Sequence, residues 1–134
     1  MVSFLNLKKN SFAFVFFILF LLIGLLIFSD YGISIDEDNT RINGFASLKY
    51  LIEILIPDMN TSVGKLQNMP SLHEFQEQGV GIIFDLPLAF IEYIFEINDS
   101  RDYYLIRHLA NFIIFFISEI LFFLITKKRF DSSR

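Results

Sequence analysis

Three consecutive carboxylates, Asp36, Glu37 and Asp38, are the residues of this chain whose type and spacing best suit chemistry. A carboxylate can act as a general base, and together with other oxygen ligands it can hold a divalent cation. The same residues also fit a structural role, because acidic side chains at the start of a helix are favoured by the helix dipole. In addition, Glu37 stands four positions before Arg41, which is the spacing of a helical ion pair. The pattern alone leaves both roles open.

Arg101 and Arg107 are candidates for binding a phosphate group, since arginine presents a planar fork of donors that matches phosphate oxygens. Asp99 and Asp102 are close enough in the sequence to neutralise these arginines locally. Arginines near a membrane surface also extend their charge toward water while their stems lie against apolar surface. The sequence favours neither the binding role nor the structural one.

Glu119 lies near the middle of an apolar run, where an ionised carboxylate costs about 2.5 kcal/mol or more on insertion scales. We therefore expect Glu119 to be protonated, partnered or facing a cavity, and we favour a contact with a further helix. A transporter or ion-conducting role would depend on Glu119 alone. His73 and His108 are 35 residues apart, which is no recognisable ligand spacing, so no metal site is predicted from them.

Two apolar runs must position these groups. Residues 11–28 contain no charge, and residues 109–126 contain a single charged residue, Glu119. A helix of eighteen residues is about 27 Å long, which is close to the hydrocarbon thickness of a bilayer. The sequence therefore predicts an all-α membrane protein with two transmembrane helices, 11–28 and 109–126, joined by a long loop at 29–108.

Basic residues outside the two runs set the expected orientation. Lys8 and Lys9 stand just before the first run, and Lys127, Lys128 and Arg129 directly follow the second. By the positive-inside rule both ends, 1–10 and 127–134, are expected in the cytoplasm and the loop outside it. The loop holds thirteen acidic and five basic residues, so its net charge of −8 excludes a basic surface for nucleic acid. The first run is longer than the core of a signal peptide and no cleavage site follows it, so we expect an uncleaved anchor.

The chain has no cysteine, so disulfides, thiolate metal sites and a cysteine nucleophile are excluded. A composition rich in Phe, Ile, Asn and Lys favours a bacterial source. We therefore expect a multi-pass protein of the bacterial inner (plasma) membrane, with the lipid bilayer as a partner.

Within the loop, apolar residues recur at three- and four-residue spacing over 40–55, and a second helical pattern covers 85–97. Pro57 ends the first of these amphipathic helices. The second is too short to cross a bilayer but suits a helix lying in its surface, so both are candidates for juxtamembrane helices. The segment 57–80 is predicted to be irregular, and a third helix is predicted to begin near Ser100 and to continue into the second span.

Several short motifs occur in order along the chain: DYGISIDE at 30–37, then Arg41 and Gly44, GIIFDLP at 81–87 and RDYYLIRHL at 101–109. In this order they resemble the start of the GT-C membrane glycosyltransferases, the group that includes protein O-mannosyltransferases and aminoarabinose transferases. In that group a first span leads into a large extracytoplasmic loop with an early catalytic Asp-Glu pair. Juxtamembrane helices and a second span follow.

The resemblance implies that Asp36 is the base that deprotonates an acceptor hydroxyl or amine while a sugar leaves a polyprenyl phosphate with inversion. Glu37 would support Asp36, and Arg101 and Arg107 would bind the lipid phosphate. The implied donor is a polyprenyl-phosphate-linked sugar, and whether a divalent cation takes part is left open.

Members of this group carry many more spans than two. The resemblance therefore implies an amino-terminal fragment that is inactive alone and needs missing or separately encoded transmembrane helices. The alternative function is that of a small two-span membrane protein whose acidic loop binds or stabilises another membrane subunit.

Overall fold

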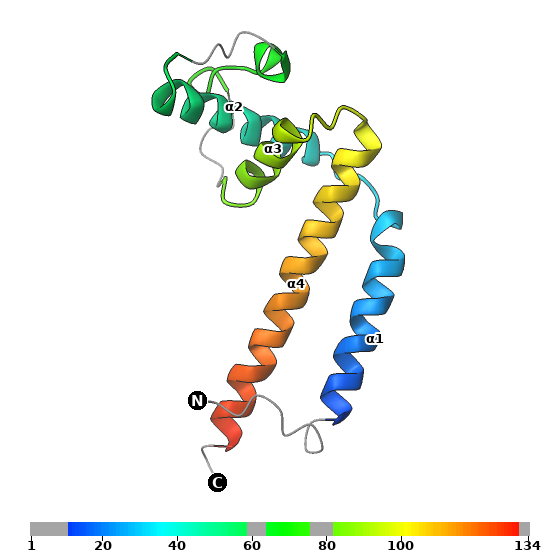
Figure 1. Cartoon of the computed structure of the whole chain (residues 1–134). Helices are drawn as coiled ribbons and strands as arrows, with labels where there is room; N and C mark the ends of the chain where they lie inside the picture. The colour runs from blue at the N-terminus through cyan, green and yellow to red at the C-terminus, as the bar shows by residue number, and fades with distance from the viewer. Residues whose placement is uncertain (1–10, 59–63, 76–81, 132–134) are drawn as a thin grey trace. The chain divides into compact units, whose positions relative to one another are not determined.

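The computed structural model describes residues 11–58, 64–75 and 82–131. Within these ranges 78% of the residues are helical and none is in a strand, which confirms the predicted all-α class. Two helical segments, of 20 and 31 residues, are long and apolar enough to cross a membrane, which indicates a membrane protein. The elements in chain order are α1 (Ser11–Ile27), the 3₁₀ helix η2 (Phe28–Asp30), α2 (Glu37–Leu55), the 3₁₀ helix η3 (Gly64–Asn68), α3 (Asp85–Ile94) and α4 (Ser100–Asp131) (Figure 1).

The chain divides into two compact units, which we describe separately. The hairpin unit comprises residues 1–31 and 107–134, and the loop unit comprises residues 32–106. Helix α4 begins at Ser100, as the sequence predicts, so its first turns belong to the loop unit and the remainder belongs to the hairpin unit.

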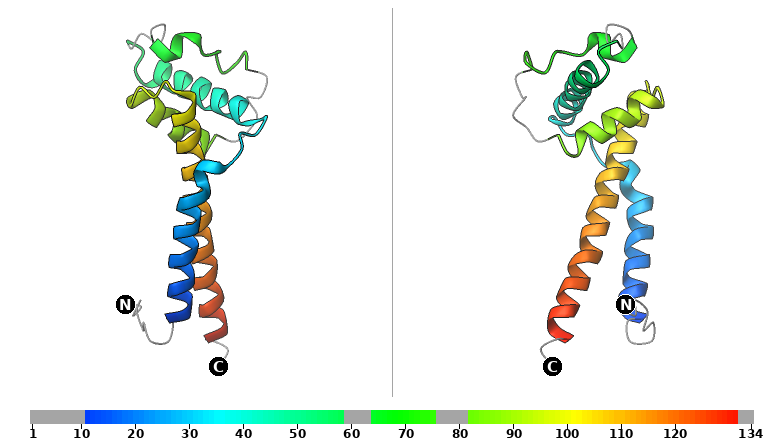
Figure 2. Two further views of the ribbon diagram at one scale, coloured as in Figure 1. Left: turned by 90° about the vertical axis from the view of Figure 1, so that its right-hand side faces the viewer. Right: turned by 60° about the vertical axis from the view of Figure 1, so that its left-hand side comes forward.

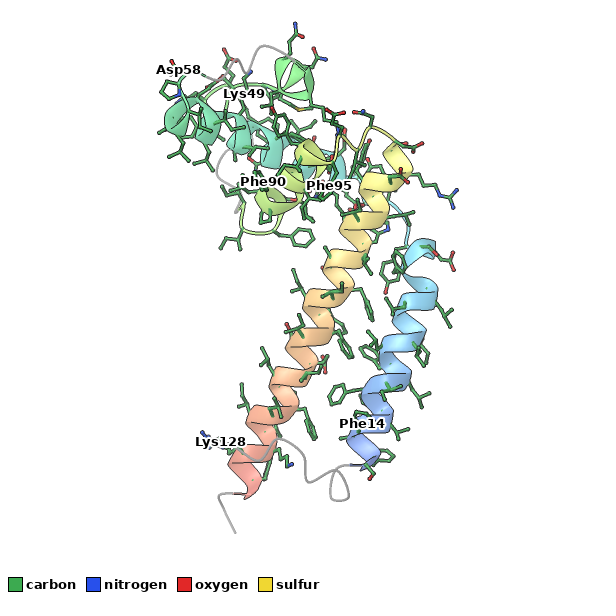
Figure 3. All side chains as sticks on the ribbon, viewed as in Figure 1. Phe14, Lys49, Asp58, Phe90, Phe95 and Lys128 are labelled. Atoms are coloured by element: carbon green, nitrogen blue, oxygen red, sulfur yellow. The ribbon has the colours of Figure 1, made fainter. Side chains whose placement is uncertain are left out.

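The hairpin unit is held together by phenylalanine rings. Helix α1 runs beside the long helix α4 in both views of Figure 2. The ring of Phe17 contacts those of Phe116 and Phe123, with centroids 6.2 and 5.5 Å apart, and Phe20 contacts Phe112 at 6.2 Å. Most other large apolar side chains of α1 and α4, such as Phe14, are exposed (Figure 3). Exposed apolar side chains over two whole helices suit a lipid solvent.

One glycine brings a ring of α4 close to the backbone of α1. Gly24 is the buried residue of α1, and a Cβ added there would lie 2.0 Å from two carbons of the Phe112 ring. Because lipid tails are as apolar as leucine, membrane helices associate through close packing of this kind, often at small residues.

Helix α2 begins at Glu37, before the predicted residue 40. The backbone N–H of Glu37 donates to the carbonyl of Ser34 at 3.1 Å, and the Thr40 hydroxyl donates to the Glu37 carbonyl at 3.1 Å. The helix ends at Leu55, where the Ile56 N–H donates to Ile52 at 2.8 Å and Pro57 follows. Six consecutive residues in its middle, from Asn43 to Leu48, are all buried.

The core of the loop unit lies between α2, η3 and α3. Gly44 permits a close approach of α2 to α3, because a Cβ at this position would lie 2.7 Å from the carbonyl oxygen of Asp85. The buried cluster consists of Phe45, Leu48, Leu66 and Ala89, with Ile52, Met69, Leu86 and Tyr93 packed against it. Leu66 belongs to η3, a short helix within the segment predicted to be irregular. Residues 59–63 and 76–80 of that segment lie outside the described residues.

Helix α3 ends at Ile94, three residues before the predicted end at 97. Glu96 has a positive φ of 50°, a left-handed conformation that stops a helix, and the Ile97 N–H donates back to the Glu92 carbonyl at 3.1 Å. The predicted helix is therefore correct in its start and too long at its end, since the sequence carries no glycine to mark the stop.

Candidate functional site

Asp36 occupies the position immediately before α2, but its side chain is not used as a cap. Its backbone has φ −85° and ψ −9°, which is helical, whereas capping residues have extended backbone, and it makes no side-chain cap hydrogen bond. The residue is exposed. The carboxylate of Asp36 is therefore accessible to another molecule and is not occupied in capping α2.

Glu37 has a more structural environment. It is half-buried, and one of its carboxylate oxygens accepts the backbone N–H of Ser34 at 3.4 Å. Together with the Glu37 N–H bond to the Ser34 carbonyl, this contact closes the turn that leads into α2. Of the two adjacent acidic residues, Asp36 is thus the one whose side chain remains available for chemistry.

Arg41 has an ion-pair partner that the helical spacing did not indicate. Its Nε donates to Glu92 Oε2 at 2.9 Å and its Nη2 lies 2.9 Å from the same oxygen. The two side chains are only 12% and 1% exposed. The helical spacing had suggested Glu37 as one possible partner; the ion pair in the structure joins Arg41 to Glu92 of α3, 51 residues away. One signal was present in the sequence, because Glu92 is four residues after Leu88 on the apolar side of α3.

The guanidinium of Arg41 also stacks on aromatic rings. It lies 3.7 Å from the ring centroid of Tyr103 in the first turn of α4 and 5.1 Å from that of Phe45. A desolvated cation over a ring face is favourable, most often for arginine. Arg41 therefore connects α2, α3 and the start of α4 close to the acidic residues at 36–38.

Lys65 of η3 binds the end of α3. Its Nζ donates to the carbonyl of Glu92 at 3.3 Å and also to the carbonyl of Ile97. Burial lowers the pKa of Lys65 from 10.5, while the negative charge of Glu92 opposes that shift. A lysine at these carbonyls suits the negative end of the helix dipole, so Lys65 fixes α3 where Glu92 meets Arg41.

A tyrosine hydroxyl lies near the acidic turn, and sequence reasoning missed it. The rings of Tyr103 and Tyr104 have centroids 4.6 Å apart, and burial raises the pKa of the Tyr104 hydroxyl. Tyr104 is also within electrostatic reach of Asp38 and Glu37. The loop unit therefore brings the first turn of α4 to the first turn of α2, and a phenol accompanies the carboxylates.

The two arginines predicted to bind phosphate have different environments. Arg101 is exposed, and its backbone N–H donates to Asp99 Oδ1 at 2.8 Å, so Asp99 caps α4. Arg107 is 3% exposed. Because side chains six residues apart leave a helix about 120° apart, the two arginines do not form one pair of adjacent donors.

No group of three or more His, Asp or Glu residues in the described ranges is arranged to hold a metal ion. The two histidines contact aromatic rings instead. His73 lies edge-on to Tyr50 at 5.6 Å, and His108 lies beside Tyr31 at 5.8 Å. The structure offers no cation site at these two residues.

Comparison of the chain with protein-family models, with curated proteins and with solved structures found no match. The fold therefore defines a class, an all-helical protein with two helices apolar enough to span a membrane.

Proposed function

We propose that this chain is the amino-terminal part of a membrane glycosyltransferase that transfers a sugar from a polyprenyl-phosphate carrier to an extracytoplasmic acceptor. The observation that carries the proposal is the state of Asp36, an exposed carboxylate at the start of a helix that makes no capping bond. The order of motifs along the chain supports the same reading. In this proposal the chain works together with further transmembrane helices.

Asp36 acts as the general base. Its carboxylate takes the proton of the acceptor hydroxyl or amine as the acceptor atom forms a bond to the anomeric carbon of the sugar. The bond from that carbon to the phosphate oxygen breaks, and its electron pair leaves with the polyprenyl phosphate. Attack from the face opposite the leaving group inverts the anomeric centre.

Neighbouring residues support this step. Glu37 holds the turn that carries Asp36 through its contact with Ser34, and Arg41 fixes the helix behind it against Glu92. Arg101, whose side chain is exposed, is assigned to the lipid phosphate on its charge and its position at the start of α4, whereas Arg107 is buried. A base held on a rigid element is positioned more accurately than one on an unsupported loop.

The experiment compares Asp36→Asn with Asp58→Asn in the assembly that contains the further transmembrane helices. Both aspartates are exposed, and Asp58 follows the far end of α2 (Figure 3). Removal of a general base lowers rates by about 10²–10⁴-fold, so Asp36→Asn is expected to lose transfer at unchanged abundance while Asp58→Asn keeps it. Transfer at a near-normal rate in Asp36→Asn would falsify the assignment. Loss of subunit binding in the same variant would favour the alternative role of the loop in binding a partner.

The topology completes the proposal. Both ends of the chain are in the cytoplasm of a bacterium, the hairpin unit crosses the plasma membrane, and the loop unit lies outside. Helix α3 has an exposed apolar side that suits the membrane surface. Its members are Phe90, Ile91 and Ile94, and the exposed Ile83 and Phe95 flank the two ends of the helix. Helix α2 is less suited to lie in lipid, because its middle is buried within the loop unit.

The position of α3 can be tested with a single tryptophan, because the chain contains none. In vesicles that contain brominated phospholipid, fluorescence of Phe90→Trp is expected to be quenched. Gln67→Trp, an exposed position on η3, serves as the control and is expected to keep its fluorescence. Equal fluorescence of the two variants would show that α3 does not lie in the lipid surface.

A further inference from the structure

Glu119 lies on the side of α4 that faces α1. Phe116 is three residues before it and Phe123 four residues after it, and helix positions at these spacings are neighbours on one side. Both of those rings contact Phe17 of α1, at 6.2 and 5.5 Å. Glu119 is half-buried. Its carboxyl group is therefore part of the hairpin seam, by which we mean Phe17, Phe116, Glu119 and Phe123.

Within residues 11–31 and 107–131, the described part of the hairpin unit, no polar side chain partners this carboxyl group. From Phe12 to Ile27, α1 contains only apolar side chains and Gly24. The hydroxyl of the adjacent Ser118 donates to the Ile114 carbonyl at 2.8 Å within α4. Among the residues that the structure describes, Glu119 has no hydrogen bond or ion pair. A carboxyl group at this depth is costly unless something outside the hairpin satisfies it.

The chemistry of the seam favours a cation. Aromatic rings attract cations to their faces, and a carboxylate between two such rings adds a full negative charge. Arginine suits this combination best, since its planar guanidinium can stack on a ring and bind a carboxylate through two donors. We propose that the hairpin seam binds an arginine or lysine side chain of a further transmembrane helix.

The depth of Glu119 identifies the source of the cation. Glu119 is ten residues from Leu109 and seven from Thr126, the two ends of the apolar run. These separations correspond to about 15 and 10 Å of helix, too deep for a lipid headgroup amine. A basic side chain carried by another helix at mid-membrane reaches this depth. Polar residues of this kind join helices inside membranes.

This inference does not depend on the sugar chemistry at Asp36, which belongs to the loop unit. Failure of Asp36→Asn to lose transfer would overturn the proposed function and leave the seam untouched. Failure of the seam to bind a basic helix would overturn this inference and leave the role of Asp36 untouched.

The test uses the full chain in phosphatidylcholine vesicles with a labelled transmembrane peptide as the probe. The peptide is an alanine and leucine helix with one central arginine, and a peptide with central leucine is its control. Energy transfer between chain and peptide reports association. The unmodified chain is expected to bind the arginine peptide at least tenfold more tightly than the leucine peptide.

A matched variant moves the carboxyl group without changing depth or composition. Ser118→Glu together with Glu119→Ser turns it about 100° around α4, out of the seam. This variant and Glu119→Gln are expected to bind both peptides equally, with helix content unchanged by circular dichroism. Equal binding of both peptides by the unmodified chain would overturn the proposal, as would retained preference in the exchanged variant. Self-association of the chain that requires Glu119 and excludes the peptide would also overturn it, in favour of a second copy.

Discussion

The hairpin unit and the loop unit are both helical, but they use their apolar residues in opposite ways. In the hairpin unit the large apolar side chains are mostly exposed, and Phe122 is 68% exposed. In the loop unit Phe45 and Leu66 are completely buried in the core between α2, η3 and α3. The first arrangement is stable where the solvent is lipid, and the second is the arrangement that water requires.

The two units also treat charge differently. The loop unit buries the Arg41–Glu92 pair and compensates it with stacking on Tyr103 and with Lys65 at the neighbouring carbonyls. The hairpin unit carries Glu119 without a partner among the described residues. The difference is that the loop unit pairs its buried charges internally, whereas the hairpin seam has the unsatisfied carboxyl group for which we propose a partner helix.

The largest expected effect is the difference in stability between alanine substitutions at two phenylalanines. Phe45→Ala should lower the stability of the loop unit by about 3–5 kcal/mol, because it leaves a cavity in the core. Phe122→Ala should change the stability of the hairpin unit by less than about 1 kcal/mol, since lipid replaces the lost ring. Hydrogen exchange of the α2 and α4 amides in micelles measures both changes. Equal losses would break the distinction between the two units.

A second prediction concerns the buried ion pair. Glu92→Ala leaves Arg41 as a buried charge without its carboxylate and should lower the stability of the loop unit by about 3 kcal/mol. Asp58→Ala, at an exposed position just after α2, is the control and should stay within about 0.5 kcal/mol. Hydrogen exchange of α2 measures both. A loss below about 1 kcal/mol in Glu92→Ala would mean that the pair does not hold α2 to α3.

The same substitution at two glycines sharpens the comparison further. Gly44→Ala forces the backbone of α3 away from α2, with an expected loss of about 1–3 kcal/mol despite the better helix propensity of alanine. Gly24→Ala meets only the outer carbons of the Phe112 ring, which can turn aside. Its net effect should be within about 1 kcal/mol of zero, because propensity offsets the displaced ring. Thermal unfolding by circular dichroism in micelles should place Gly44→Ala well below Gly24→Ala, and the reverse order would contradict this account.

The smallest expected effect is a pH dependence from Lys65. Burial lowers its pKa in the folded loop unit, so between that pKa and 10.5 the unfolded chain binds more protons than the folded one. Stability should therefore rise with pH across this interval. The free energy of unfolding is measured against pH for the unmodified chain and for Lys65→Met, and the difference between the two curves isolates the contribution of Lys65. The same difference for Lys49→Met serves as the control. A difference that falls with pH would show that the lysine charge is stabilised, not penalised, in the folded state.

Much of the fold could be predicted because it depends on local patterns. The uncharged run 11–28 became α1 and η2, and the start of α4 at Ser100 follows from the charged residues that precede the second run. The period of apolar residues located α2 and α3. The sequence could not supply the end of α3 at Ile94, because no glycine marks the stop that Glu96 makes with its positive φ. It also could not supply η3, because Gly64 and the later Pro70 favour an irregular segment and the short helix is packed into the core through Leu66.

The candidate site was predictable only in part. Asp36 could be selected from its position after an apolar run and from the motif around it. That its side chain makes no capping hydrogen bond to α2 could be learned only from the structure. The Arg41–Glu92 pair and the approach of Tyr104 to Asp38 depend on how distant helices pack. Such contacts have no spacing in the sequence, since they arise from tertiary structure alone.

The central claim is that the hairpin unit crosses a membrane and holds the loop unit outside it. The chain has no cysteine, so single cysteines can report position without background. Gln67→Cys on η3 and Lys128→Cys near the end of α4 are both exposed positions. In bacterial spheroplasts, whose plasma membrane is intact, a membrane-impermeant maleimide should label Gln67→Cys at once. Lys128→Cys should be labelled only after the membrane is permeabilised. Labelling of both without opening the membrane, or in the reverse order, would contradict the account.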